Sequence, residues 1–254
     1  MRPRIIPVLL MDRNRRLVKT RQFGERVYVG DPFNTIRLFN EKEVDEICIL
    51  DIDATLDERE PDPGFVRELA SECFMPMAYG GGIARAKQCE ALLKAGIEKF
   101  VVGAGGADVQ LLKSMSAVMG AQAVVVCADF RGTGKEASIA THQGMYGIGV
   151  HPVEYAQRAQ DAGAGEVILQ SIDRDGTRHG YDTAMIAEVA RSIDIPLIAL
   201  GGAGDSGHLR AGLHAGASAV ASGSAFVFVG RLRAVLITYP MGTELQAIVE
   251  GATQ

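Results

Sequence analysis

The chain has 254 residues, of which 47% are apolar and 22% charged, and its formal net charge is −5. These values are ordinary for a globular protein, and a chain of this length can bury enough apolar surface to fold without disulfides or a structural metal. No basic block suggests a nucleic-acid partner, and no run of 18 apolar residues suggests a membrane span, so we expect a cytoplasmic protein.

The N-terminal segment MRPRIIPVLLMD combines positive charge with an apolar run. The run is short and fits a first β-strand better than a signal peptide. Further β-branched runs follow along the chain, and helical stretches with apolar residues at a 3.6-residue period lie between them. The predicted strands are Arg4–Leu10, Glu46–Asp51, Met75–Tyr79, Lys99–Gly103, Ala123–Asp129, Glu166–Ser171, Pro196–Leu200 and Ala217–Ser222. The predicted helices include Ala86–Ala95, Asp108–Met119, Pro152–Ala162 and Thr183–Ser192.

This alternation predicts an α/β fold, and several strands are apolar on both faces, which is typical of a parallel sheet covered by helices. Eight β/α units in about 250 residues match the size of a (β/α)8 TIM barrel. A doubly wound open sheet is the alternative, but it usually has fewer units and no internal two-fold. Because no linker or low-complexity tract interrupts the chain, we expect one domain over residues 1–254.

An internal repeat with an offset near 120 residues supports the barrel. MPMAYGGGI, from Met75, matches IPLIALGGAG, from Ile195, and LLKAGIEKFVVGAG, from Leu92, matches GLHAGASAVASGS, from Gly212. We interpret the repeat as two half-barrels, roughly 1–120 and 121–240, followed by a variable C-terminal tail. Neither half could close alone, whereas two copies make a barrel without free edges.

The cysteines and histidines show no metal-binding pattern. The four cysteines are far apart with no CxxC pair, and the five histidines show no HxH or HExxH spacing. We therefore expect buried, reduced thiols and neither a metal nor a cofactor.

Glycine-rich clusters follow the third, fourth, seventh and eighth predicted strands. Small residues at such places let a substrate oxygen approach backbone N–H groups, so the clusters predict two opposed phosphate cradles for an elongated, doubly phosphorylated small molecule. Tight turns are the alternative explanation for any one cluster. The predicted substrate-binding residues are Gly81, Gly82, Gly103, Gly202, Gly204, Ser222 and Ser224.

Carboxylates stand where the predicted strands end, which is the catalytic face of a barrel. Asp51 ends the second strand, Asp129 ends the fifth, and Asp175 follows the sixth. Two such acids could serve as general acid and base, and solvation or helix N-capping is the alternative role for each acid taken alone. Lys19 could contact an anion or a carboxylate at the same face, or could be a surface lysine.

The repeat also reveals a gap on the first strand. The position equivalent to Asp129 is Leu10, so an acid on the first strand is missing or has moved. Asp12, two residues further on, is the candidate replacement as a catalytic acid.

Several motifs together resemble the cyclase subunit of imidazole glycerol phosphate synthase, HisF. The resemblance covers Arg4 to about Phe228, and SIDRDGT followed by GYD favours the cyclase over the related isomerase barrel. The matching motifs are RIIP at the start, GDP at 30–32, the strand ending LDI at 50–52, GGGI at 80–83, QAVVV at 122–126, SIDRDGT at 171–177, GYDT at 180–183 and GGAG at 201–204.

The resemblance implies a TIM barrel that receives ammonia from a glutaminase partner docked at its base. Ammonia would travel through the barrel and react at the mouth with a bisphosphate nucleotide. Asp129 matches one family acid, whereas Leu10 stands where the other is expected. The family ring of charges that gates ammonia entry falls on Arg4, Glu46, Lys99 and Glu166. A structural salt-bridge plug is the alternative role for that ring.

Three departures from the cyclase pattern leave a second function open. They are Leu10, Gly103-Ala104 in place of Asn-Thr, and the ending RAVLITYP at 233–240. They resemble a paralogous branch linked to amidation of surface sugars, in which the barrel passes ammonia to a sugar amidotransferase. A scaffold that only activates the glutaminase and conducts ammonia is the non-catalytic alternative.

Overall fold

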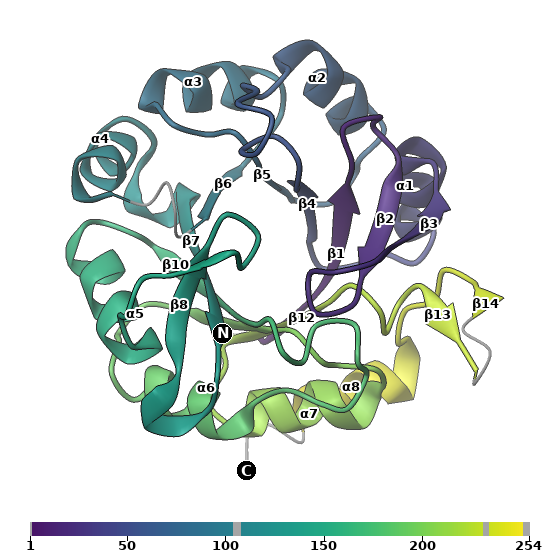
Figure 1. Cartoon of the computed structure of the whole chain (residues 1–254). Helices are drawn as coiled ribbons and strands as arrows, with labels where there is room; N and C mark the ends of the chain where they lie inside the picture. Colours follow the sequence, from purple (N-terminus) through teal and green to yellow (C-terminus); the bar gives the residue numbers. More distant parts are fainter. Residues whose placement is uncertain (1, 104–107, 231–233, 251–254) are drawn as a thin grey trace.

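The computed structural model describes residues 2–103, 108–230 and 234–250. A closed ring of eight parallel strands forms its centre, as the sequence predicts, and helices surround the ring (Figure 1). The last pairing, between β10 and β7, closes the ring. The barrel strands are β1 (Arg4–Met11), β4 (Ile47–Asp51), β5 (Met77–Gly80), β6 (Lys99–Gly103), β7 (Val124–Arg131), β10 (Glu166–Ser171), β11 (Leu197–Leu200) and β12 (Ala219–Ser222).

Eight α-helices cover the outside of the ring within the described residues. They are α1 (Pro32–Asn40), α2 (Pro63–Ser71), α3 (Ala86–Lys94), α4 (Val109–Met119), α5 (Pro152–Asp161), α6 (Thr183–Ala190), α7 (Ser206–His214) and α8 (Gly242–Glu250). Aspartates cap several of their N-termini, and proline occupies the first position of α1, α2 and α5. Asp182 of the GYD motif is one such cap, because its side chain accepts from the Met185 amide.

Three antiparallel extensions were not predicted. β2 (Leu17–Thr20) and β3 (Arg26–Gly30) form a hairpin after β1, and β8 (Ser138–Thr141) and β9 (Tyr146–Gly147) form another after β7. β13 (Phe228–Val229) pairs with β14 (Ala234–Val235) beyond β12. Two 3-10 turns, η1 (Ala121–Ala123) and η2 (Gly134–Glu136), flank β7. The first two hairpins project from the C-terminal ends of their strands, over the barrel mouth (Figure 1).

Apolar side chains pack in two layers. The larger cluster fills the space between strands and helices, and the smaller one fills the barrel interior. The smaller cluster takes alternate residues of each strand, as strand geometry requires. On β1 these residues are Ile6, Val8 and Leu10, on β4 Cys48, on β6 Val101, and on β7 Val125 and Cys127. A path of apolar groups and thiols therefore lines the barrel axis.

Within the described residues, no helix is long and apolar enough to cross a membrane. Over the same ranges, no group of three or more histidine, cysteine or acidic side chains could hold a metal ion.

Candidate functional site

A cavity of about 530 Å³ opens at the C-terminal ends of β4, β5, β6 and β7. Five of the predicted site residues line it: Asp51, Gly81, Gly82, Gly103 and Asp129. Seven others do not belong to its lining: Asp12, Lys19, Asp175, Gly202, Gly204, Ser222 and Ser224. The cavity therefore lies on the first-half side of the mouth, with Leu10, Leu50 and Val101 on its apolar floor.

Asp129 is the cavity residue best suited to proton transfer. Burial raises the pKa of its carboxyl to about 7, and the nearby Asp175 charge acts in the same direction, while a contact with the Cys127 thiol opposes it. The Cys127 Sγ lies 3.3 Å from Asp129 Oδ1. A carboxyl with this pKa can both accept and donate a proton near neutral pH.

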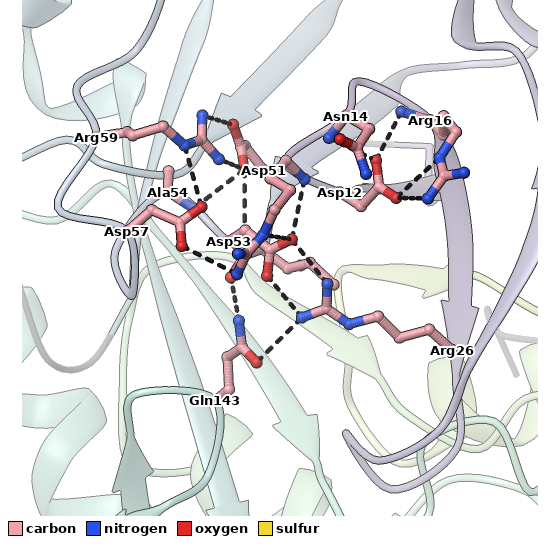
Figure 2. Close-up of polar contacts among 12 residues, drawn as sticks. Asp12, Asn14, Arg16, Arg26, Asp51, Asp53, Ala54, Asp57, Arg59 and Gln143 are labelled. Carbon is pink, nitrogen blue, oxygen red and sulfur yellow. Dashed lines mark hydrogen bonds and ion pairs between the residues drawn. The ribbon is translucent and has the colours of Figure 1, made fainter.

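Asp12 does not face the cavity. Its Oδ1 accepts from the amides of Asn14 and Arg16 at 2.9 and 3.0 Å, and its Oδ2 accepts from the Arg16 guanidinium at 2.9 and 3.1 Å (Figure 2). Burial alone would raise the pKa of Asp12, but these hydrogen bonds outweigh it and hold the pKa below its usual value. The carboxylate organises the β1–β2 turn, whereas buried Leu10, on the same strand, lines the cavity.

Asp51 lines the cavity, but its acceptors are already engaged. The Arg59 guanidinium donates to both oxygens at 3.0 and 3.1 Å, and the amides of Asp53 and Ala54 donate to Oδ1 at 3.2 and 3.1 Å (Figure 2). Asp51 thus holds the loop after β4 in place. Its backbone explains the glycine at position 81, because a Cβ there would lie 2.4 Å from the Asp51 carbonyl oxygen.

Arg26, Asp53 and Gln143 form a hydrogen-bonded cluster at the rim of the cavity, here called the clasp. Sequence reasoning missed this cluster. Arg26 of β3 donates to both oxygens of fully buried Asp53 at 2.7 and 2.6 Å. Gln143, in the β8–β9 hairpin, contacts Arg26 at 3.4 Å and donates to the Ile52 carbonyl (Figure 2). The Arg26 hydrogen bonds lower the pKa of Asp53 to about 2, so the clasp stays charged. The alternating, β-branched run RVYV at 26–29 was the signal that could have revealed β3.

Lys19 and Asp175 lie near each other, and neither belongs to the cavity lining. Lys19 is buried, its Nζ donates to the Val8 carbonyl at 2.5 Å, and desolvation lowers its pKa to about 8 despite the Asp175 charge. Asp175 accepts from the Thr20 hydroxyl at 2.6 Å, and burial raises the pKa of Asp175. These contacts tie strand β2 to the loop after β10.

The two predicted phosphate cradles differ in their surroundings. In the first, a Cβ at Gly103 would meet no atom within 4 Å, so the backbone there is open to the cavity. Residues 104–106 of the same cluster lie outside the described residues. In the second, the Arg178 side chain donates to the Gly204 carbonyl at 3.0 Å, and a Cβ at Gly202 would lie 2.2 Å from the Gly180 carbonyl oxygen.

The serines of the second cradle are buried. Ser222 Oγ donates to the Ala203 carbonyl and accepts from the Ala225 amide, both at 3.0 Å, and Ser224 is 8% exposed. Ser222 therefore holds together the loops after β11 and β12.

Four charged side chains meet at the base of the barrel, at the opposite end from the cavity. Arg4 donates to Glu46 and, at 2.9 Å, to Glu166. Lys99 Nζ lies 3.0 Å from Glu46 and 3.1 Å from Glu166. Each cation thus contacts both carboxylates, and the ring carries no net charge. The structure brings together all four residues that the sequence selected for this ring.

The interior cluster connects this base ring to the cavity. Arg4 and Leu10 are both on β1 and six residues apart, which corresponds to about 20 Å along an extended strand. Between these levels the inward-facing residues are apolar groups and the thiols of Cys48 and Cys127.

Comparisons with known proteins agree with this architecture. A family model described as "Histidine biosynthesis protein" matches residues 4–232. A protein of Leptospira borgpetersenii, provisionally named as imidazole glycerol phosphate synthase subunit HisF, is 42% identical over 252 residues, covering 98% of this chain and 99% of that protein.

Two further relatives cover most of this chain. A Pseudomonas aeruginosa protein, provisionally named as imidazole glycerol phosphate synthase subunit hisF2, is 44% identical over 242 residues, covering 94% of this chain and 96% of that protein. Imidazole glycerol phosphate synthase subunit HisF of Streptomyces coelicolor is 39% identical over 234 residues, covering 91% and 92% of the two chains.

Proposed function

This chain belongs to the histidine biosynthesis protein family, and on that premise we propose that it is the barrel subunit of a glutamine-dependent complex of the imidazole glycerol phosphate synthase type. In this proposal a HisH-like glutaminase docks at the base of the barrel and releases ammonia there. Ammonia passes along the barrel axis and is used at the C-terminal mouth on a phosphorylated small molecule.

The base ring is the observation that carries the proposal. Glu46 and Glu166 are buried, and Arg4 and Lys99 are only partly exposed. Removing charges from water in this way is costly unless they are paired, and a buried ion pair is weak evidence for a purely stabilising role. Here Arg4 and Lys99 each bridge Glu46 and Glu166 across the axis, immediately below an apolar interior. A ring of this kind can exclude ions while closed and admit a small neutral molecule when one cation moves aside.

The residues at the barrel mouth support proton transfer and the binding of an anionic group. Asp129 can exchange a proton near neutral pH, and the open backbone at Gly103 offers room for an anionic group. The lining includes one acid poised in this way, Asp129, whereas Asp51 already accepts four hydrogen bonds. Asp129 is therefore the aspartate of the lining that we propose for proton transfer.

A second candidate function is favoured by Leu10. An apolar side chain lines the cavity at the position where the cyclase acid is expected, and Asp12 is held away from it by Arg16. In this alternative the barrel has little cyclase activity and relays ammonia to a sugar amidotransferase of surface polysaccharide synthesis. The name hisF2 of the Pseudomonas aeruginosa relative is consistent with a role distinct from that of HisF.

An isotope experiment tests the shared part of both candidates. The complex with its glutaminase is given glutamine labelled with ¹⁵N in the amide, together with unlabelled ammonium and an acceptor. We expect most nitrogen in the product to be labelled, because the channelled ammonia does not mix with the solution. Equal labelling of product nitrogen and free ammonium would contradict conduction through the barrel.

The acceptor decides between the two candidates. With the bisphosphate nucleotide as acceptor, we expect slow turnover; with a sugar amidotransferase added, we expect labelled nitrogen in the amidated sugar. Fast cyclisation of the nucleotide by the unmodified chain would rule out the relay as the main function.

A further inference from the structure

Tyr239 reaches the base of the barrel from the C-terminal segment. Its ring is buried and packs against Phe226 with centroids 5.5 Å apart. The segment is fixed by backbone hydrogen bonds from Thr238 to Phe226 and from Leu236 to Val227, both 2.9 Å. These hydrogen bonds hold the segment in place, and the Tyr239 hydroxyl thereby lies at the start of β1.

The hydroxyl joins two segments that each carry a member of the base ring. It lies 3.0 Å from the Ile5 carbonyl oxygen and 3.1 Å from Asp45 Oδ2, and the Ile5 amide also donates to Asp45 Oδ2 at 3.0 Å. Burial and the Asp45 carboxylate raise the pKa of the phenol, so it remains a donor at neutral pH. Ile5 follows Arg4 and Asp45 precedes Glu46, so this contact fixes the backbone beside both partners of one ring ion pair.

We infer that Tyr239 and Asp45 are positioning residues that hold the Arg4–Glu46 side of the base ring shut, so that opening is confined to the Lys99 side. The inference rests on the proposed role of the ring as a gate. Lys99 belongs to the opposite side, at the start of β6, and reaches the carboxylates through a flexible four-carbon stem. A ring with one fixed side and one flexible side can open for ammonia without losing its alignment.

The chain contains its own reporters of gate opening. Cys48 lies two residues beyond Glu46 and faces the barrel interior, directly behind the ring. Cys127 lines the cavity and reports access from the mouth, while Cys89, on α3, is buried in the outer layer and reports global unfolding. The rate at which a small neutral reagent, methyl methanethiosulfonate, modifies each thiol can be followed by mass spectrometry on the full chain.

We expect Tyr239→Phe to raise the modification rate of Cys48 about tenfold, the usual weight of one hydrogen bond to a charged group, without changing Cys127 or Cys89. Asp45→Asn should do the same, and it keeps the test decisive should Tyr239→Phe fold poorly. Tyr181→Phe is the matched control, because it removes the hydroxyl of another buried tyrosine. That hydroxyl donates to the Ala221 carbonyl over 2.8 Å and contacts no residue of the base ring.

The outcomes separate this inference from the proposed function. If Cys48 is unchanged in both variants, or if all three thiols react faster together, Tyr239 and Asp45 do not position the gate. Lys99→Ala tests the ring itself. If that variant exposes Cys48 while Tyr239→Phe and Asp45→Asn do not, the gate stands and the positioning role is wrong; if Lys99→Ala leaves Cys48 protected, the gate is wrong.

Discussion

Replacing Asp129 with asparagine should stabilise the fold above neutral pH. The pKa of this carboxyl is about 7 in the native state against 3.8 ordinarily. Between those pH values the native state holds a proton that the unfolded chain has lost, so the stability of the wild type falls as pH rises from about 4 to about 7 and is constant above. At about 1.4 kcal/mol per unit, the whole effect has an upper limit of about 4 kcal/mol.

Urea unfolding of the wild type and Asp129→Asn at pH 5 and pH 8 measures this effect. Because water in the cavity screens part of the burial term, we expect the stability advantage of the variant to grow by about 2 kcal/mol between the two values. Asp12→Asn is the control, because the pKa of Asp12 is lowered and its stabilisation is therefore complete at both pH 5 and pH 8. That variant should be destabilised by the same amount at the two pH values. A stability difference for Asp129→Asn that is the same at both pH values would refute the burial argument.

Three other variants test the mouth, the ring and the rim. Leu10→Asp should raise turnover of the bisphosphate nucleotide about 10²-fold by restoring a second acid, and an unchanged rate would show that Leu10 is not the obstacle. Lys99→Ala should lower glutamine-dependent product formation more than ammonia-dependent formation in steady-state assays, whereas equal losses would count against the gate. Arg26→Ala should lower the free energy of unfolding by roughly 3 kcal/mol, because fully buried Asp53 loses its main countercharge. The Arg13 amide and guanidinium also lie 2.9 and 3.6 Å from Asp53 Oδ2, and a loss below about 1 kcal/mol in urea titrations would show that they suffice.

The barrel was predictable because its strands carry a strong local signal. Each is a short run buried on both faces, and the ends found differ from those predicted by no more than two residues, as for Met77 in β5 and Ala219 in β12. The base ring was predicted from the resemblance to the cyclase family, and the position of Arg4, Lys99 and Glu166 at the start of otherwise apolar strands is consistent with it.

The site was less predictable because its contacts join segments far apart in the sequence. Nothing local indicates that Arg26 bonds Asp53, or that Gln143 reaches the Ile52 carbonyl 91 residues away. The orientation of Asp12 depends on the turn between β1 and the unpredicted strand β2, which pairs with β1 in antiparallel orientation. Strand ends can therefore be located from the sequence, but whether an acid there faces substrate or a neighbouring arginine depends on the loops.

The base ring has a consequence for how the two repeats depend on each other. Both countercharges of Glu166 come from residues 1–120, since Arg4 and Lys99 belong to that segment. A fragment of residues 121–254 would retain a carboxylate that has lost both of its cationic neighbours, and its complement would carry an excess positive charge at the matching place. The two fragments, expressed separately, should accordingly be poorly folded alone. When mixed they should associate, because the unpaired charges favour the heterodimer over either homodimer.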